Sequence, residues 1–168
     1  MLHWKVTDFA SLTVFELYDL LKLRVDVFIT EQNCPYSDLD DKDTAPNTLH
    51  VLGYRDDKLV AYCRILPPGL GYPHEVHDQI PANASDIAIG RVVTNHTYRG
   101  QGLGHQLMIF SVKTAKEKWP NKSIFISAQA HLAQYYGQYG FVKATQPYDE
   151  DGIPMLGLIW KPIVETVV

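Results

Sequence analysis

A glycine-rich turn, Arg-Gly-Gln-Gly-Leu-Gly, occupies residues 99–104. It follows the apolar run 86–94, which is predicted to be a strand, and it precedes a segment whose apolar residues recur at helical spacing. Gly100, Gly102 and Gly104 leave the backbone free to adopt positive φ and to approach a ligand closely. The first amides of the helix lack intrahelical partners and, together with the helix dipole, favour an anion. The order of strand, glycine turn and helix therefore predicts a phosphate site.

Two other nucleotide-binding motifs also place glycines after a strand. Dinucleotide fingerprints belong to the first β-α unit of a parallel sheet and carry an acidic residue about 20 residues further on, whereas this turn lies past the middle of the chain. A Walker phosphate loop requires Gly-Lys-Ser/Thr after the glycines, which this turn lacks. Both motifs are therefore disfavoured. The alternative that the glycines only form a tight connection between strand and helix stays open.

Length and composition indicate an ordinary globular protein. The chain is 46% hydrophobic and 20% charged, and its 168 residues suit one domain, predicted to span residues 1–168. A net charge of −4 argues against a general nucleic-acid binder. The apolar runs are strand-length and the N-terminus lacks the regions of a signal peptide, so we expect a cytoplasmic protein without a membrane segment. Cys34 and Cys63 are expected to be free or buried thiols.

The first part of the chain predicts a strand, a helix and a loop. Residues 4–9 can form a strand, and Thr13 is expected to cap a helix that runs to about residue 29. Residues 31–47 are rich in aspartate and contain two prolines, which predicts a loop. The apolar face predicted for the helix consists of Val14, Leu17, Leu20, Leu21, Val25 and Phe28.

The remaining segments alternate between strand and helix patterns. Runs 49–54 and 59–66 flank Arg-Asp-Asp-Lys and predict an antiparallel hairpin, and residues 67–85 are expected to form a loop. After the glycine turn, the buried helix face is expected to consist of Leu103, Leu107, Met108, Val112, Ala115 and Trp119. Further elements are predicted at 123–128 (strand), 131–139 (helix, capped by Gly140), and 141–144 and 155–160 (paired strands around the turn-rich 147–154). Antiparallel strands followed by a β-α-β unit predict an α+β fold with a mixed sheet and helices packed on it.

Several motifs of the chain resemble those of a known enzyme family. Arg99-x-x-Gly102-x-Gly104 after a strand is similar to the acetyl-CoA signature of the GNAT N-acetyltransferases, and segment 129–141, with a tyrosine before a Gly-Phe pair, resembles the next motif of that family. The similarity spans about residues 15–158. It implies the GNAT fold, in which a mostly antiparallel twisted sheet splays at a central parallel strand pair and carries helices on both faces. More narrowly, the chain resembles the ElaA subfamily in segments 23–36, 89–93, 128–132 and 150–154.

The resemblance implies acetyl-CoA as the acetyl donor and assigns residues to it by position. Gln129 stands where relatives often have an asparagine that contacts the cofactor. The strand before the turn is expected to pair with the pantetheine arm through the backbone of Val92, Val93 and Thr94. The pyrophosphate is expected to bind the amides of Arg99, Gly100, Gln101, Gly102, Leu103 and Gly104.

Acetyl transfer to an amine requires a neutral nucleophile, a polarised thioester carbonyl and a proton for the departing thiolate. By the resemblance, Tyr136 occupies the family position of the general acid that protonates the sulfur. Tyr135 and Tyr139 are alternatives, and a purely structural place in the core is the competing role of Tyr136. A backbone N–H near residues 92–93 is expected to polarise the carbonyl.

The sequence does not identify a general base. Many relatives carry a glutamate on the strand that here spans residues 87–93, and no carboxylate occurs in this run. Glu31 with Gln32 is a candidate for amine binding or for deprotonation through water, and a solvated position at the helix end is the alternative. Three histidines could titrate near neutrality, although a lone histidine is more often structural: His50, His96 and His131.

Arg91 is unusual because it is predicted to alternate with Ile87, Ile89 and Val93 on one face of a central strand. A buried guanidinium needs a partner. Arg91 either pairs with a carboxylate, such as Glu31 or a loop aspartate, or faces the cleft and orients the substrate, and pairing is favoured. The loop aspartates lack the EF-hand pattern, so we expect a solvated loop, or one that attracts a cationic amine, and no metal: Asp38, Asp40, Asp41 and Asp43.

The combined prediction is an acetyl-CoA-dependent N-acetyltransferase in which a primary amine attacks the thioester directly in a ternary complex. A non-catalytic acyl-CoA-binding or sensing module, and an acyltransferase with a different acyl donor, are the alternatives. Met155 favours the first alternative, because ElaA-like sequences often carry a histidine after Asp-Gly-Ile-Pro. The acceptor is expected to be a small-molecule or peptide amine, with no nucleic acid or membrane as partner, and a homodimer is one option for the oligomeric state.

Overall fold

One eight-stranded mixed sheet organises the computed structural model, which describes residues 1–163. Along the sheet the strands follow the order β1-β2-β3-β4-β5-β8-β6, with β7 paired to β8. Only the β4–β5 pair is parallel among the strand pairs of residues 1–163. The strands are β1 (Leu2–Thr7), β2 (Leu49–Arg55), β3 (Lys58–Leu66), β4 (Ile87–Thr94), β5 (Ile124–Gln129), β6 (Val142–Lys143), β7 (Tyr148–Glu150) and β8 (Ile153–Trp160).

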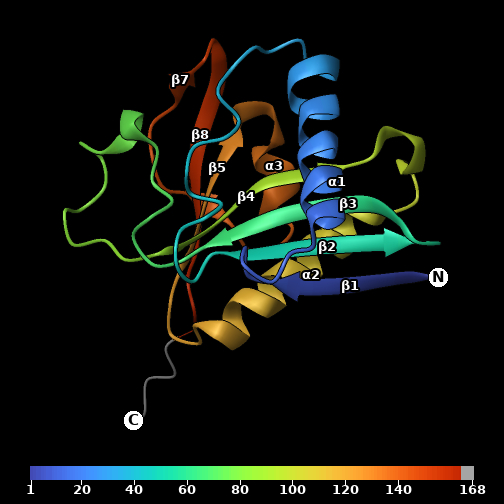
Figure 1. The fold of residues 1–168 in the computed structure, drawn as a ribbon. Helices are drawn as coiled ribbons and strands as arrows, with labels where there is room; N and C mark the ends of the chain where they lie inside the picture. The colour runs from blue at the N-terminus through green and yellow to red at the C-terminus, as the bar shows by residue number, and fades with distance from the viewer. Residues whose placement is uncertain (164–168) are drawn as a thin grey trace.

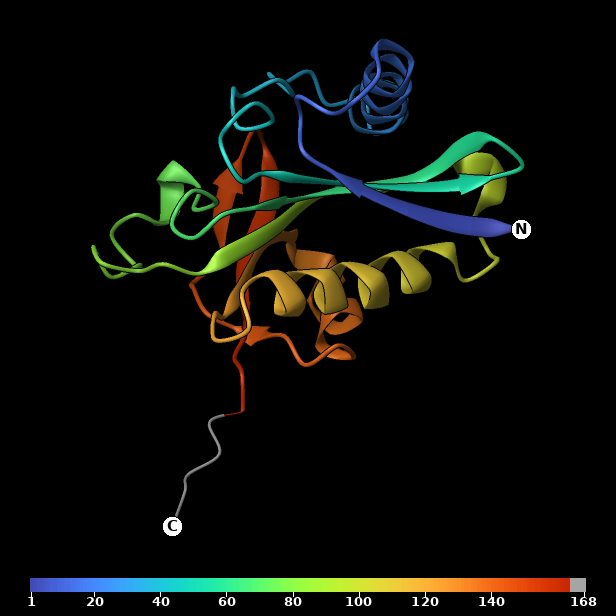
Figure 2. The same cartoon turned by 60° about the horizontal axis from the view of Figure 1, so that its bottom comes forward.

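Helices cover both faces of the sheet, as the family resemblance implied (Figure 2). Helix α1 packs its Leu20 and Leu23 against Leu52 and Tyr62 on one face. Helix α2 packs on the opposite face, where its Leu107 contributes to the larger hydrophobic core. None of the helices within residues 1–163 is long and apolar enough to span a membrane. The helical elements are α1 (Val14–Arg24), η1 (Val25–Glu31), η2 (His74–Val76), η3 (His96–Tyr98), α2 (Leu103–Lys118), η4 (Ala130–Leu132) and α3 (Ala133–Gly137).

The first helix begins as predicted and ends differently. Thr13 caps α1 with a capping box, because its side chain accepts from the Glu16 amide while the Glu16 carboxylate accepts from the Thr13 amide. The predicted α-helix to about residue 29 is wrong, since a seven-residue π-helix, η1, follows Arg24. The wider turn of a π-helix rotates the side chains away from the 3.6-residue spacing. Val25, directly after α1, is 44% exposed, and Val14 in the first turn is 81% exposed, so neither belongs to the buried face.

The predicted hairpin is confirmed, and a second hairpin was missed. Strands β2 and β3 pair antiparallel around Asp56 and Asp57, both at positive φ, as a two-residue hairpin turn requires. The segment 147–154, predicted to be turn-rich, contains β7 and the start of β8. These strands pair around Asp151 and Gly152, which also have positive φ. β7 has only three residues, too few to show strand periodicity in the sequence.

A β-bulge in β4 corrects the predicted alternation around Arg91. In the β3–β4 register Tyr62 lies opposite Val93 and Arg64 opposite Gly90, so β4 carries one extra residue, and Arg91 has a φ of 51°. Ile87 and Ile89 belong to the core under α2, whereas Val93 belongs to the core under α1. The prediction that Arg91, Ile87, Ile89 and Val93 share one face is therefore wrong, because the extra residue reverses the face that follows it.

Candidate functional site

Strands β4 and β5 separate after a short paired segment, as predicted for the sheet (Figure 1). They pair only at Ile87–Ile124 and Ala88–Phe125, although β4 continues to Thr94 and β5 to Gln129. A cavity of about 550 Å³ opens between them and is lined by residues 89–92 and 126–129. We call it the central cavity. Its walls include backbone that the partner strand leaves free for a ligand.

The glycine turn lies at the end of β4 and is open. Gly100 and Gly102 have φ of +77° and +70°, and a Cβ on either would meet nothing within 4 Å. Gly102 is the N-cap residue of the 16-residue helix α2, and no side chain caps that helix. Arg99 donates from Nη2 to the Thr94 carbonyl at 3.3 Å, so the turn folds back against the strand end. Free helix amides at an open turn form an anion site.

The side chains around the turn are held by residues from other elements. Arg99 forms a two-point ion pair with Glu31 at the end of η1, in which Nη2 lies 3.2 Å from Oε2. The hydrogen bond from Arg99 lowers the pKa of Glu31. Gln101 accepts a hydrogen bond from Arg55 of β2. Glu31 therefore lies on the surface beside the turn and does not line the central cavity, as the solvated alternative required.

Gln32 and Gln129 meet across the two sides of the central cavity. Both line it, and Gln129 Nε2 donates to Gln32 Oε1 at 3.3 Å. Gln32 follows η1 and Gln129 ends β5, so residues 97 positions apart in the chain are brought together. The structure thus places Gln32, but not Glu31, where an acceptor could contact it.

Tyr136 lies in α3 and lines the central cavity, whereas Tyr135 of the same helix and Tyr139 do not line it. It is 7% exposed, and burial raises the pKa of its phenol. A phenol is protonated at neutral pH even at its ordinary pKa, so Tyr136 carries the proton that a general acid donates. Tyr139 instead donates to the Tyr135 hydroxyl at 3.3 Å and meets His105 Nδ1 at 2.9 Å. Among Tyr135, Tyr136 and Tyr139, only Tyr136 lines the central cavity.

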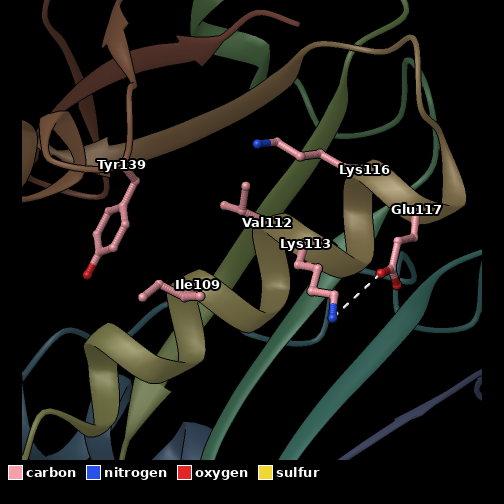
Figure 3. A pocket seen from close by; sticks show the side chains of 6 residues that line it. All are labelled: Ile109, Val112, Lys113, Lys116, Glu117 and Tyr139. Carbon is pink, nitrogen blue, oxygen red and sulfur yellow. Dashed lines mark ion pairs between the residues drawn. The ribbon is translucent and has the colours of Figure 1, made fainter.

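Tyr139 borders a different hollow on the outer side of α2 (Figure 3). This hollow measures about 450 Å³ and is lined mainly by the side chains of α2. Its charged groups are exposed, and Lys113 pairs with Glu117 at 3.8 Å. A surface ion pair of this kind contributes little to stability, and, apart from the alternative Tyr139, none of the residues predicted for catalysis or donor binding lines this hollow.

Arg91 pairs with the aspartate loop, which confirms the favoured role. Its Nε lies 2.9 Å from Asp38 Oδ1, and its Nη2 donates to the Asp38 carbonyl at 3.0 Å and reaches Asp40 Oδ2 at 3.4 Å. Its guanidinium also lies 5.4 Å from the ring centroid of Tyr36. Arg91 lines the central cavity as well. Its guanidinium is therefore held by the carboxylates of Asp38 and Asp40 while the side chain borders the space for a ligand.

The prediction that the aspartate loop is solvated, or attracts a cationic amine, is wrong for Asp38, Asp40 and Asp43, whereas Asp41 is exposed as predicted. Asp38 and Asp43 are buried and bind the fully buried Arg24, each at 2.8 Å. Arg64 of β3 donates to Asp40 at 2.7 Å and to Asp43 at 3.1 Å. Within residues 1–163 no three His, Cys, Asp or Glu side chains form a group that could hold a metal ion. The carboxylates therefore neutralise arginines that arrive from α1, β3 and β4, an arrangement that the loop sequence alone does not reveal.

This ion network predicts acid sensitivity. Burial of Asp40 acts to raise its pKa, but the hydrogen bond and charge of Arg64 outweigh burial and lower the pKa to about 2. A carboxyl whose pKa is depressed on folding stabilises the protein above its ordinary pKa, and this stabilisation is lost as the pH falls through the folded value. We expect the melting temperature to fall between about pH 4 and pH 2, measured by circular dichroism, and Asp40→Asn to flatten this dependence. An unchanged slope in Asp40→Asn, relative to the exposed turn variant Asp57→Asn, would contradict the assignment.

The three candidate histidines differ in burial and in whether they line the central cavity. His50 is buried, with Nδ1 2.8 Å from the Tyr62 hydroxyl and Nε2 3.0 Å from the Asp43 carbonyl, so it is structural. His96 is exposed in η3 and does not line the central cavity. His131 is exposed and lines it.

Several polar residues of the central cavity were not selected from the sequence, and two of them, Ser127 and Glu150, contact each other. Ser127 of β5 and Glu150 of β7 both line it, and Ser127 Oγ donates to Glu150 Oε2 at 3.4 Å. Ser127 Oγ also hydrogen-bonds the Tyr148 hydroxyl. Glu150 begins segment 150–154, one of the motifs that resemble the ElaA subfamily, and this was the available signal. Its place beside β5 depends on the short β7–β8 hairpin, which periodicity does not predict.

Comparisons with known proteins agree with this geometry. A family model described as "Acetyltransferase (GNAT) domain" matches residues 28–161. Protein ElaA of Escherichia coli is 39% identical over 94% of this chain and 95% of its own. The crystal structure of that ElaA has a TM-score of 0.82, with 38% identity over 96% of this chain and 100% of that chain. An acyl-CoA N-acyltransferase from Pseudomonas aeruginosa has a TM-score of 0.83, with 43% identity over 95% of this chain and 99% of that chain. With its acyl-CoA N-acyltransferase fold, this chain belongs to the GNAT acetyltransferase family and is ElaA-like.

Proposed function

We propose that the chain is an N-acetyltransferase that uses acetyl-CoA and transfers the acetyl group to a primary amine in a ternary complex. The observation that carries this proposal is the buried Tyr136 phenol in the wall of the cavity between the splayed strands β4 and β5. A proton donor thus lies where the two strands leave room for a thioester. Membership of the GNAT family supports the acyl-transfer class of the reaction.

The donor would lie along the backbone from β4 to α2. In this proposal the strand edge at residues 92–94 pairs with the pantetheine arm, and the amides of residues 99–104 hold the pyrophosphate. The Val93 side chain is buried under α1, so only its backbone is available. Gln129, on the opposite strand, lines the same cavity and could contact the arm. Backbone contacts suit a cofactor whose phosphates need oriented N–H donors.

The bulge in β4 supports a role for the backbone in polarising the thioester. The β3–β4 register described here contains no partner for Arg91 or Val92. An N–H freed in this way can point toward the cavity and donate to the thioester oxygen as negative charge develops on it. Nitrogen then bonds to the carbonyl carbon and the carbon–sulfur bond breaks. Tyr136 protonates the sulfur, and the proton that nitrogen loses as the amide forms restores the phenol.

The proposal is tested by coenzyme A release from purified protein. We expect release to depend on a primary amine, with spermidine, glucosamine and a lysine peptide as three classes of acceptor and thiol detection as the readout. Acetyl-CoA, butyryl-CoA and octanoyl-CoA compared under the same conditions measure the acyl preference. Tight acetyl-CoA binding without turnover on any acceptor would instead identify a binding module, and faster turnover of a longer acyl-CoA would overturn the acetyl assignment.

A further inference from the structure

Glu150 is held at the central cavity by the second hairpin and by β5. It ends β7 and lies opposite Ile153 in the register with β8, next to the tight turn at Asp151 and Gly152. Ser127 Oγ reaches its Oε2 at 3.4 Å from β5, one of the two splayed strands. Ser127 is in turn hydrogen-bonded to Tyr148. The carboxylate is therefore held by contacts from β5 and β7, and it lines the same cavity as Tyr136.

The surroundings of Glu150 favour a carboxylate that binds a proton readily. Burial raises the pKa of Glu150, and the negative charges of Glu75 from η2 and of neighbouring Asp151 act in the same direction. The positive charge of Arg91 from β4 and the hydrogen bond from Ser127 oppose the rise without cancelling it. A carboxylate with a raised pKa is a stronger base.

The other carboxylates near the site are less suited to accept a proton. Asp40 lines the central cavity, but Arg64 and Arg91 hold it, and its pKa is lowered to about 2. Glu31 is paired with Arg99 outside the cavity. Asp151 lines the cavity from an exposed turn position. Glu150 is the partly buried carboxylate of the cavity wall that no arginine or lysine pairs with among residues 1–163.

We infer that Glu150 is the general base that deprotonates the acceptor, an inference that rests on the proposed acetyl transfer. A primary alkylamine is an ammonium ion at neutral pH and cannot attack a thioester until it loses a proton. Glu150 accepts this proton through Oε1 or Oε2, directly or through one water, and the neutral amine then attacks the carbonyl carbon. Tyr136 donates to the departing sulfur, so base and acid act on opposite partners of the reaction.

The acid side of the pH profile tests this role. Turnover requires the carboxylate form, so kcat/KM should fall as the pH drops through the Glu150 pKa. Glu150→Gln is expected to lower kcat/KM about 100-fold and to remove this acid limb. The acetyl-CoA Kd from calorimetry should stay unchanged, because the proposed donor contacts lie on β4 and the glycine turn and Glu150 belongs to β7. Glu117→Gln, an exposed change on α2, is the matched control and should alter neither quantity.

Two neighbouring variants should move the acid limb in opposite directions. Glu75→Gln removes a negative charge that raises the Glu150 pKa, so the limb should shift to lower pH. Ser127→Ala removes a donor that stabilises the carboxylate, so the limb should shift to higher pH. A carboxylate with only a structural role would show neither shift.

The outcomes separate this inference from the proposed function. Wild-type turnover of spermidine, glucosamine or the lysine peptide, with loss of rate and of the acid limb in Glu150→Gln, supports Glu150 as the base. Wild-type turnover with the rate and acid limb retained in Glu150→Gln overturns the inference and leaves the proposed function standing. Acetyl-CoA binding without turnover of any of these amines overturns the proposed function, and the role of Glu150 with it.

Discussion

Tyr136→Phe is expected to lower kcat by up to about 1000-fold while leaving the acetyl-CoA Kd unchanged. The substitution removes the hydroxyl and keeps the ring, which packs edge-on against Tyr135 and Phe141. The fold should therefore persist, because the ring contacts carry the packing. Without the phenol the thiolate of coenzyme A departs unprotonated, and the barrier to breakdown rises. Steady-state kinetics of coenzyme A release and calorimetric binding of acetyl-CoA measure the two effects separately.

Tyr139→Phe is the matched control for this substitution. Tyr139 belongs to the same turn region, but its hydroxyl bonds to Tyr135 and His105 and does not reach the central cavity. Its loss should change kcat by no more than a few-fold. Equal losses in the two variants would place the proton donor outside Tyr136. A fully active Tyr136→Phe would show that the ring is only a core aromatic.

Gly102→Val is expected to weaken acetyl-CoA binding by about 1000-fold, since it changes the N-cap residue of α2, next to the amides proposed to hold the pyrophosphate. Gly102 has a φ of +70°, where a non-glycine residue costs about 1–2 kcal/mol and a β-branched one is strained further. A backbone that relieves this strain turns the first amides of α2 away from the pyrophosphate. If the backbone instead keeps its conformation, the valine side chain projects into the open space in front of the turn, where the phosphates would lie. Calorimetric titration with acetyl-CoA and with coenzyme A measures the loss.

Gly69→Val separates backbone strain from ligand contact. Gly69 has a φ of +82° in the loop after β3, far from the turn in sequence, and a Cβ there would meet the Ala84 carbonyl at 3.6 Å, an ordinary contact. It should lower the melting temperature by a similar amount to Gly102→Val and leave the acetyl-CoA Kd within a few-fold of the wild type. An unchanged Kd in Gly102→Val with a folded protein would remove the pyrophosphate from this turn.

Local features of the sequence predicted a large part of the fold. The Asp56–Asp57 hairpin, the Thr13 cap and the apolar face of α2 depend on contacts within a few residues, and each is confirmed. The glycine turn also carries its own conformation, because Gly102 starts α2 at positive φ. The motif around Tyr136 indicated which of three neighbouring tyrosines lines the central cavity.

The errors lie where side chains distant in sequence decide the local structure. The π-helix after Arg24 and the bulge at Arg91 break the regular periods on which sequence patterns depend. Arg24 and Arg91 are the two residues at these irregular positions, and both bind Asp38 of the loop. These partners lie 14 and 53 residues away from Arg24 and Arg91, so an argument from local propensity cannot include them.

The sequence by itself determined the family, the mixed sheet, the open glycine turn and the position of Tyr136. Each of these depends on a contiguous motif or on the local spacing of apolar residues. Only the tertiary structure decided which polar groups surround the central cavity. It paired Glu31 with Arg99 outside the cavity and brought Glu150 to its wall through the β7–β8 hairpin. Charge neutralisation and desolvation depend on distances across the fold, so the roles of these carboxylates could not follow from their places in the chain.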